Sequence, residues 1–429
     1  MITDVKVQFF SHLNGLNLGN NWGDLIRLLD AALVNGLSLP SISTASIDDQ
    51  GDVHLTFNAD HKALLFQVVE LTGFLPESLN QKYRIKGVPN NTQLILKPAN
   101  VLPDTPILNN GAAKLASLGY EIIFRDVNDV KRVYRAKNPT AQHPFIRVDE
   151  TISGLNGNYS DTYAKYAMVG LLEHMTHIDD YANPNVLQLP FDPSDPAKNW
   201  KITGTGTAVV RGWSHWYYAR NGDSFALKEN AATPLNGARY FTIIGDQDAF
   251  YFLNSLTADT NGYDRKIIYG LGLFKSSINN SVVPNWFLAT TLHQFSANQS
   301  FDLSANSPFN GSLPFSLSAN HCDFFTTRYT PAEKINNHIL AKPILPDYQS
   351  GFSNKFPQNS GFSALQIPFY DELGFLRGTL KHICYSGKSI VSNKTTPQNA
   401  DFSMAVLDSV LTGSAGRKGC FAFYLGELE

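Results

Sequence analysis

One stretch, Tyr240–Leu253, constrains the fold of this 429-residue chain more than any other. Two runs of β-branched and aromatic residues flank the turn-forming residues Gly245–Asp248. Such runs on either side of a short turn are typical of a β-hairpin, and their apolar character indicates two largely buried strands. We therefore expect small β units before this hairpin and a second β-rich half after it.

Composition favours a globular protein that is rich in strands. Hydrophobic residues make up 43% of the chain and charged residues 17%, which excludes a disordered chain. The 28 Phe and 18 Tyr outnumber the 4 Met, a balance that favours strands, where aromatic rings pack on a pleated surface. The net charge of -3 gives no field that attracts nucleic acid or an anionic membrane, so we expect neither as a partner.

The cysteines and the N-terminus bear on the compartment. Cys322, Cys384 and Cys420 lie far apart without Cys-x-x-Cys spacing, so we expect free thiols in a reducing cytoplasm rather than disulfides or a zinc site. Residues 1–10 lack the basic and apolar regions of a signal peptide. No apolar run approaches the roughly 18 residues that span a bilayer.

One helix is predicted near the start, from about Trp22 to Val34. Its apolar residues fall on one face, and Asn35-Gly36 is a suitable stop. A short helix with one apolar stripe must bury it. We expect packing on the adjacent β unit, with docking on a neighbouring subunit as the alternative. The predicted buried residues are Leu25, Leu28, Leu29, Ala32 and Leu33.

The remaining chain is predicted as strands, so the fold class is mainly β: several small barrel- or sandwich-like modules in series with one short N-terminal helix. Pro98–Asn110, with three prolines, is predicted as a linker, and Ser296–His321 as long functional or interface loops. Val209–Tyr218 is expected to pair with the hairpin. The predicted domains are 1–45 (strand and helix for docking), 46–100 (small β module), 101–275 (central β domain) and 276–429 (C-terminal β domain with long loops). The predicted strands are Val53–Phe57, Phe66–Leu71, Tyr83–Val88, Gln93–Leu96, Glu121–Phe124, Lys131–Arg135, Phe145–Val148, Tyr163–Leu172, Ala364–Tyr370, Leu376–Leu380 and Gly419–Leu425.

The polar groups that could carry chemistry are weak candidates. His174 and His177 have the i, i+3 spacing of a helix face and are followed by two aspartates, but no distant third ligand is evident, so hydrogen-bonded loop residues are favoured over a metal site. Neighbouring residues on a strand face opposite sides, so Ser214 and His215 do not form a nucleophile–base pair. The carboxylate pairs are adjacent strand residues, which face opposite sides, or ordinary turn residues. None of them is therefore favoured as the acid pair of a glycoside hydrolase. The groups concerned are His174, His177, Asp179 and Asp180; Asp149 and Glu150; Asp246 and Asp248; Asp371 and Glu372.

Two further clusters have structural interpretations. Trp213, Trp216, Tyr217 and Tyr218 could stack on sugars, but a hydrophobic core is the commoner use of such residues. A local basic run is expected to form a solvated hairpin face rather than a nucleic-acid footprint. Its members are Arg125, Lys131, Arg132, Arg135 and Lys137. No residue is predicted as catalytic, cofactor-binding or metal-binding.

Several stretches together resemble a family of tailed-bacteriophage and prophage virion structural proteins. The correspondence follows most of the chain in order, although His174, His177 and Ser300–Leu345 depart from it. The matching stretches are Leu25–Gly36; His61, Leu71–Gly73, Asn80 and Tyr83–Ile85; Lys131–Pro139 and Arg147–Asp149; Met175 and Asp179; Tyr240–Leu253; and Leu376–Leu380.

The resemblance implies a non-enzymatic part of the virion, in the tail or baseplate, that is assembled in the host bacterial cytoplasm. Its expected partners are other tail or baseplate proteins and further copies of itself, in a ring or trimer, with no cofactor. Alternatives are a receptor- or glycan-binding protein of the tail tip, with Trp213 and Trp216 as a stacking surface for a host glycan, a capsid-associated structural protein, or an enzyme acting on surface polysaccharide.

Overall fold

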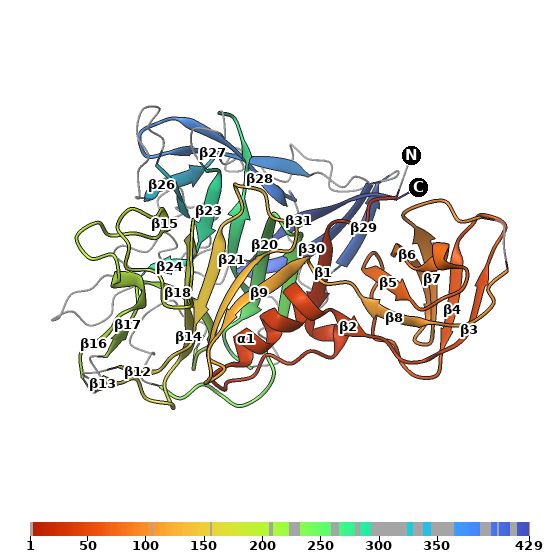
Figure 1. Cartoon of the computed structure of the whole chain (residues 1–429), viewed down its shortest axis with the longest axis horizontal. Coiled ribbons are helices and arrows are strands. Elements are labelled where there is room, and N and C mark those ends of the chain that lie inside the picture. The colour runs from red at the N-terminus through yellow and green to blue at the C-terminus, as the bar shows by residue number, and fades with distance from the viewer. Residues whose placement is uncertain are drawn as a thin grey trace.

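The protein is mainly β with one short α-helix, which confirms the predicted fold class. Its computed structural model places two sheets in one body, and a third sheet projects to the right in Figure 1. Cys322 and the predicted loops Ser296–His321 lie outside the described part of the chain. The described residues are 3–103, 106–154, 157–205, 209–222, 232–258, 266–278, 284–292, 324–328, 338–344, 364–386, 396–400, 403–411 and 418–428.

The predicted hairpin is confirmed and belongs to a sheet of thirteen strands, here called the large sheet. Ile243 lies opposite Phe252, and every residue of both hairpin strands is buried. The Asp246 carboxylate closes the turn by accepting hydrogen bonds from the backbone N–H groups of Asp248 (2.9 Å) and Ala249 (3.2 Å). In spatial order the strands are β1 (Gln8–Ser11), β19 (Phe241–Gly245), β20 (Ala249–Ser255), β21 (Lys266–Leu273), β23 (Trp286–Ala289), β25 (Phe324–Thr327), β26 (His338–Pro343), β27 (Leu365–Asp371), β28 (Leu376–Tyr385), β31 (Lys418–Glu427), β30 (Ser403–Leu411) and β29 (Thr396–Ala400), with β22 (Lys275–Ser276) paired to β28.

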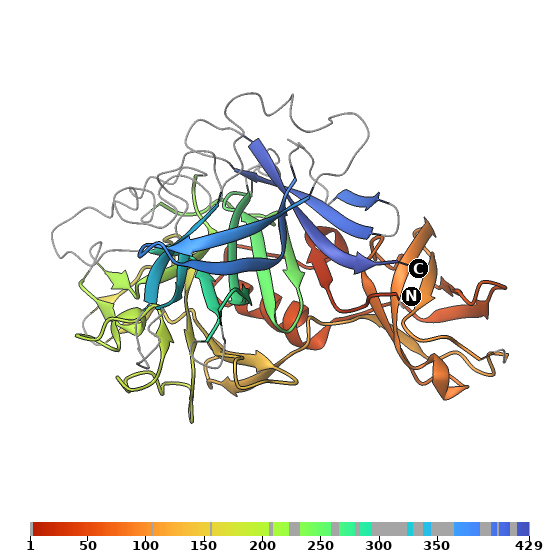
Figure 2. The same cartoon turned by 90° about the horizontal axis from the view of Figure 1, so that it is seen from above.

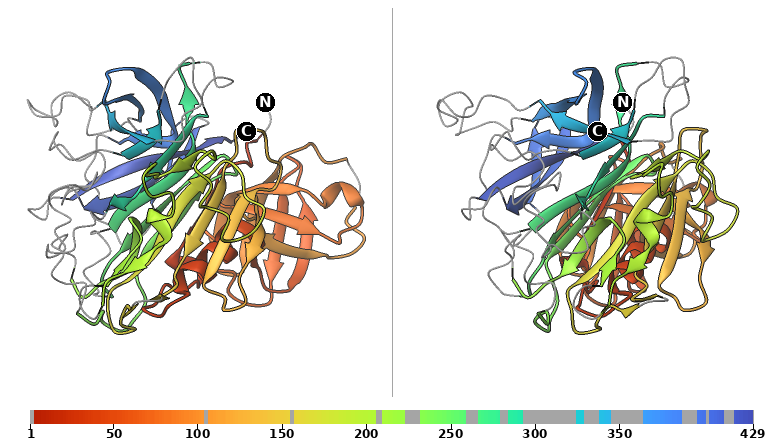
Figure 3. Two further views of the ribbon diagram at one scale, coloured as in Figure 1. Left: turned by 60° about the vertical axis from the view of Figure 1, so that its left-hand side comes forward. Right: turned by 90° about the vertical axis from the view of Figure 1, so that its left-hand side faces the viewer.

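The large sheet curls, so that strands distant in its order approach each other; in Figure 3 the blue C-terminal strands lie over the green ones. Lys266 Nζ of β21 lies 2.5 Å from Asp408 Oδ1 of β30, and both side chains are fully buried. The Tyr251 hydroxyl of β20 donates a hydrogen bond of 3.0 Å to the Lys381 carbonyl of β28. Because buried polar groups need these particular partners, such contacts favour one closure of the sheet.

A second sheet packs face to face on the large sheet through aromatic rings. Trp216 stacks on Phe252 and Tyr269, with ring centroids 6.0 and 5.4 Å apart. The prediction that Val209–Tyr218 pairs with the hairpin is wrong, because β18 in this segment hydrogen-bonds to β14 and β24 and meets the hairpin only through side chains. The order is β24 (Thr291–Leu292), β18 (Ser214–Ala219), β14 (Lys165–Leu172), β11 (Phe145–Asp149), β10 (Lys131–Ala136) and β9 (Tyr120–Arg125), with β15 (Gln188–Leu189) paired to β14. Two small hairpins are β12 (Ser153–Gly154) with β13 (Gly157–Asn158), and β16 (Ile202–Thr203) with β17 (Val210–Arg211).

The third sheet, here called the N-terminal sheet, contains the four strands predicted between Val53 and Leu96, together with three more. Pro98–Asn110 is not a linker to another domain, because it returns the chain from β7 to β8 in this same sheet. The four-domain division remains a prediction, although the sheets cross its boundaries at residues 45, 100 and 275. The order is β2 (Leu37–Ser38), β8 (Ala112–Leu115), β5 (Val68–Thr72), β6 (Lys82–Asn90), β7 (Gln93–Pro98), β4 (Val53–Phe57) and β3 (Ile42–Ile47).

The predicted helix is confirmed as α1 (Asp24–Leu29), which continues as a π-helical segment, η2 (Asp30–Asn35). All five residues of its predicted apolar face are buried within the chain's own core. Gly36 ends the helix with a φ of +71°, a conformation that favours glycine. Packing on the chain's own β units is therefore confirmed for this face. Three short 3-10 turns are η1 (His12–Asn14), η3 (Glu77–Leu79) and η4 (Lys198–Trp200).

The N-terminal sheet is fixed to the body by buried polar side chains, here called the joint: Gln8, Gln67 and Arg84. Gln8 of β1 donates to the carbonyls of Val68 and Ala116, both at 2.8 Å, and its amide oxygen accepts from Val68 N at 2.9 Å. Gln67 Nε2 reaches back to a body strand, donating to the Phe9 carbonyl at 2.7 Å. Through these amide side chains, the backbone of β1 is connected to the backbone of the N-terminal sheet. Because hydrogen bonds depend on angle as well as distance, the joint fixes the orientation of the sheet on the body.

Arg84 is the centre of the joint. Its guanidinium is fully buried, and it donates five hydrogen bonds of 2.6–3.1 Å to four backbone carbonyls. Those carbonyls come from the N-terminal segment, from the chain before β5 and from β31, which lie together beside the sheet (Figure 2). Burial lowers the pKa of Arg84 to about 10. The four acceptors are Asp4, Val7, Phe66 and Leu425.

Candidate functional site

The His174–Asp180 segment is a hydrogen-bonded loop. The backbone N–H and the hydroxyl of Thr176 both donate to Asp180 Oδ2 at 2.8 Å, and these bonds lower the pKa of Asp180. Asp179 accepts from Lys131 at 3.0 Å and from Arg147 at 2.7 Å. Both aspartates are therefore engaged with the protein itself. Within the described residues, no group of three or more His, Cys, Asp or Glu side chains is placed to hold a metal ion.

Two carboxylates of the predicted pairs join ionic clusters around the hairpin turn. Asp248 lies 2.9 Å from His143 Nε2 and also binds Lys381, and Asp246 lies 3.1 Å from His382 Nε2. The hydrogen bond from His143 and the nearby Lys381 hold the pKa of Asp248 well below its usual range, against the opposing effect of burial. These carboxylates thus connect the hairpin turn to His143 and to Lys381 and His382 of β28.

Glu150 is buried between the start of α1 and the second sheet. Its carboxylate accepts hydrogen bonds from the backbone N–H groups of Gly23 and Ile26 (2.9 Å) and from the Tyr218 hydroxyl (2.8 Å). Burial raises the pKa of Glu150 to about 6, although these donors act in the opposite direction. The neighbouring carboxylate, Asp149, points elsewhere and pairs with Arg147 at 2.9 Å.

The aromatic segment is mostly core. Trp216, Tyr217 and Tyr218 are each at most 2% exposed, so the core interpretation holds for them, and Trp216 has no surface for an external ligand. Trp213 is half-buried, with Lys198 Nζ 4.4 Å from its ring and His338 5.3 Å away. The predicted glycan-stacking pair therefore does not form a shared surface.

Ser214 and His215 diverge as expected. The Ser214 hydroxyl donates to Thr290 Oγ1 at 2.7 Å, whereas the His215 ring stacks on Tyr166 at 4.0 Å. His215 Nε2 lies 2.5 Å from the Arg211 carbonyl. Neighbouring strand positions face opposite sides, which accounts for the separation.

The predicted solvated face of the basic run is wrong for its central member, although Arg125 and Lys137 are exposed. Arg132 is fully buried, and its Nε lies 3.1 Å from Asp30 Oδ2 in the helical segment. Tyr134 donates to the other Asp30 oxygen at 2.7 Å, and Arg125 adds an ion pair of 3.1 Å. A buried carboxylate on the helix thus explains why the strand beneath it carries arginine.

Residues quoted for the family resemblance meet in space. Asp30 of the helix motif contacts Arg132 and Tyr134 of the second motif, about a hundred residues later. Arg147 likewise bridges Asp149 and Asp179. These groups are internal and mostly buried, so they explain how the motifs fold together.

An exposed apolar cluster was not predicted. The turn between β27 and β28 and the strand ends beside it are here called the tip. Tyr370 is 38% exposed, Leu373 55%, Phe375 49% and Leu376 53%. Its strands lie along the upper edge of Figure 1, away from the N-terminal sheet. An exposed group of large apolar residues commonly marks an interaction surface. The signal in the sequence was a turn, Asp371–Leu376, that contains apolar residues where polar ones are usual.

The tip is rigidly supported by one carboxylate of the predicted Asp371–Glu372 pair. Asp371 is fully buried, and its Oδ1 accepts hydrogen bonds from the backbone N–H groups of Leu373 (3.1 Å) and Phe375 (3.0 Å). Its second oxygen lies 3.3 Å from Arg377, which is also fully buried. Gly374 has a φ of +87°, which the turn requires. The apolar side chains are therefore held outward by a fixed backbone.

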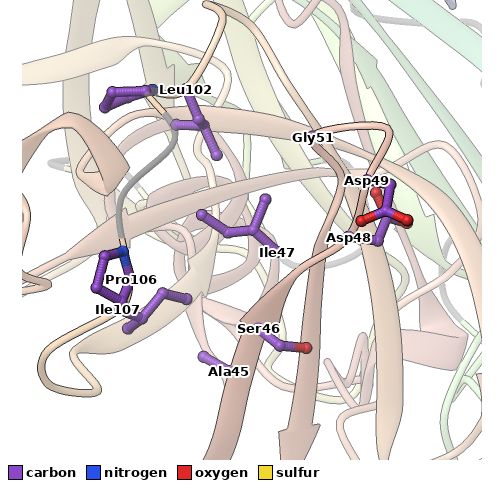
Figure 4. A pocket seen from close by; sticks show the side chains of 10 residues that line it. Ala45, Ser46, Ile47, Asp48, Asp49, Gly51, Leu102, Pro106 and Ile107 are labelled. Carbon is purple, nitrogen blue, oxygen red and sulfur yellow. The ribbon is translucent and has the colours of Figure 1, made fainter.

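A hollow of about 740 Å³ lies beside strand β3, between that strand and the chain after β7 (Figure 4). Asp48 and Asp49 stand at one end of it, while Leu102 and Ile107 form the opposite wall. The sequence did not predict β3 and so missed this feature. The full lining is Ala45, Ser46, Ile47, Asp48, Asp49, Gly51, Leu102, Pro103, Pro106 and Ile107.

Comparison with protein-family models gave no match, and comparison with curated proteins gave none either. The resemblance to virion structural proteins therefore rests on its motifs alone. No helix in the described part of the chain has the length and apolar character needed to cross a membrane.

Proposed function

We propose that the protein is a structural component of a tailed-phage virion, in the tail or baseplate, which acts by oligomeric assembly and not by catalysis. The tip is the observation that carries this proposal. Four large apolar side chains stand outward on a turn that is fixed by a buried carboxylate. The motif resemblance supports the same function.

A second copy of the chain is the proposed occupant of the tip. Virion parts surround a symmetry axis, and closed homo-oligomers use one apolar patch in every subunit. Burying exposed apolar surface favours association, and aromatic anchors such as Phe375 commonly dominate it. The candidate catalytic carboxylates and histidines described above contact other parts of the same chain, which is consistent with a structural role.

The test is the oligomeric state of Leu373→Ser and Phe375→Ser in analytical ultracentrifugation. We expect wild-type protein to self-associate and each variant to weaken association at least tenfold, because each removes apolar surface at the centre of the tip. Leu108→Ser is the matched control, since Leu108 is 73% exposed in the connection between β7 and β8 of the N-terminal sheet.

The second part of the test locates the protein in purified phage particles. Antibody labelling should place the protein on the tail, and labelling of the head would replace the tail assignment by a capsid-associated one. A wild-type protein that stays monomeric at high concentration and is absent from purified particles by mass spectrometry would refute the proposal.

A further inference from the structure

Strand β3 (Ile42–Ile47) is an unprotected sheet edge. It pairs with β4 on one side and is the last strand in the order of the N-terminal sheet. Its sequence, Ile-Ser-Thr-Ala-Ser-Ile, contains none of the charged residues or prolines that usually protect edge strands. The opposite edge strand, β2, has only two residues. The length and neutrality of β3 make it suitable for pairing with another strand.

The outer edge of β3 has backbone groups free to pair. The N–H of Asp48 bonds across the sheet to the Asp52 carbonyl at 3.0 Å. Because strand residues alternate, Ala45 and Ile47 then direct their N–H and C=O groups away from β4. Within the described residues, the outer edge of β3 receives one hydrogen bond, from Asn110 Nδ2 to the Ser43 carbonyl at 3.2 Å.

The hollow lies along this same edge, and the charged residues among those that line it are both acidic, Asp48 and Asp49. Ala45 and Ile47 line it together with Leu102 and Ile107 (Figure 4). Its volume of about 740 Å³ falls within the usual range of ligand pockets, about 300–1,000 Å³. The apolar side chains of Leu102 and Ile107 beside a free strand edge are suited to contact the alternate side chains of an added strand.

The acidic end of the hollow selects the partner's charge. Asp48 is paired with His54 at 2.9 Å, and the buried Asp52 is balanced by Lys86 (2.5 Å) and Lys97 (3.3 Å). Asp49 is exposed and takes part in no ion pair within the described residues. A basic side chain on an incoming segment would therefore find an uncompensated carboxylate here.

We propose that β3 binds an extended segment of a partner protein as an eighth, antiparallel strand, with apolar side chains in the hollow and a basic side chain at Asp49. A second copy of β3 is disfavoured as the occupant, because residues 37–61 contain no Lys or Arg to face that carboxylate. All strand pairs of this sheet are antiparallel, so the basic residue belongs near the start of the bound segment. This inference does not rest on the proposed virion function.

The test uses a synthetic peptide, acetyl-Lys-Thr-Val-Thr-Val-Thr-amide, with the full-length protein. Amide hydrogen exchange of Ala45 and Ile47 should slow at least tenfold with bound peptide, while that of Ser46 stays unchanged. Fluorescence anisotropy of labelled peptide should show at least tenfold weaker binding when Glu replaces the peptide's Lys, and also for Asp49→Lys.

Ala45→Pro is the blocking variant. Proline is tolerated on edge strands where the N–H faces outward, so the sheet should remain folded while the added strand loses a bond. Ser46→Ala is the matched control and should bind normally. The proposal is overturned by absent binding at millimolar peptide, by binding without protection of Ala45 and Ile47, by equal binding of the Glu peptide, or by equal binding to Ala45→Pro. Loss of self-association in Ala45→Pro without peptide would make a second copy the occupant and overturn it as well.

Discussion

At the joint, amide and guanidinium side chains are buried against backbone carbonyls; at the tip, large apolar side chains are 38–55% exposed. Arg84 is fully buried, whereas Leu373 is 55% exposed. Both regions are nevertheless rigid, since Arg84 makes five hydrogen bonds and a buried aspartate fixes the turn of the tip.

The joint is a contact within one chain, whereas the tip is a proposed contact between two chains. A buried cation needs acceptors at fixed positions, which a covalently connected chain supplies during folding. An exposed apolar cluster has no such need, so it can remain in water until a partner covers it. The comparison predicts that stability depends on the joint and association depends on the tip.

The largest expected effect is that of Arg84→Met. The variant should lose about 3–5 kcal/mol of unfolding free energy, because four buried carbonyls lose their donor. Urea denaturation should be followed by hydrogen exchange of the N-terminal sheet and by tryptophan fluorescence. All five tryptophans lie outside that sheet, so fluorescence reports on the body alone.

Arg27→Met is the matched control for Arg84. The Arg27 side chain is 57% exposed and pairs with Asp24 at 2.5 Å, so its loss should cost at most about 1 kcal/mol. Equal effects of the two substitutions would show that the joint does not hold the sheet to the body.

A smaller effect is expected at Glu150, the buried polar contact of α1. Its pKa is raised from 4.5 to about 6, so the folded state binds the proton more tightly than the unfolded state. The contribution to stability is then fully present below pH 4.5 and is lost as the pH rises through about 6. From pH 4.5 to 7 the wild type should lose about 2 kcal/mol relative to Glu150→Gln.

Denaturation midpoints at several pH values measure this difference. The relevant quantity is the wild-type curve minus the Glu150→Gln curve, because other groups titrate in both proteins. A difference that is flat over this range, or that rises with pH, would contradict the buried, proton-binding state of Glu150.

The smallest effect on stability is expected at the tip. Leu373→Ser should change the unfolding free energy of the monomer by less than about 0.5 kcal/mol, since the side chain is already in solvent. Urea denaturation at protein concentrations too low for self-association measures the unfolding free energy of the monomer alone. A loss of several kcal/mol would mean that the tip belongs to the core, and the contrast with the joint would disappear.

The sequence predicted local elements well and long-range contacts poorly. The hairpin, the helix and four strands of the N-terminal sheet follow from residue periodicity, which acts over a few positions, whereas β2, β3 and β8 were not predicted. The neighbours of β18 do not, because periodicity marks a buried strand without choosing its partner. Arg84 was not recognised because β6 is covered on both faces, so that Tyr83, Arg84 and Ile85 are all buried.

The support of the tip and the buried ion pairs were harder to predict than the fold. Asp371 was identified only as half of a carboxylate pair, and its role in holding the tip depends on which way the turn points. Arg132 was expected in solvent because Asp30, its partner, is about a hundred residues away in sequence. Both errors concern groups whose partners are brought near only by the complete fold.

The hydrogen bonds of Arg84 and Gln8 hold the N-terminal sheet on the body. The free edge of β3 and the tip lie at opposite ends of the molecule in Figure 1. A molecule that holds one neighbour at each end would therefore act as a spacer of fixed length and orientation, and the angle between those neighbours would be set by this chain rather than by the neighbours themselves.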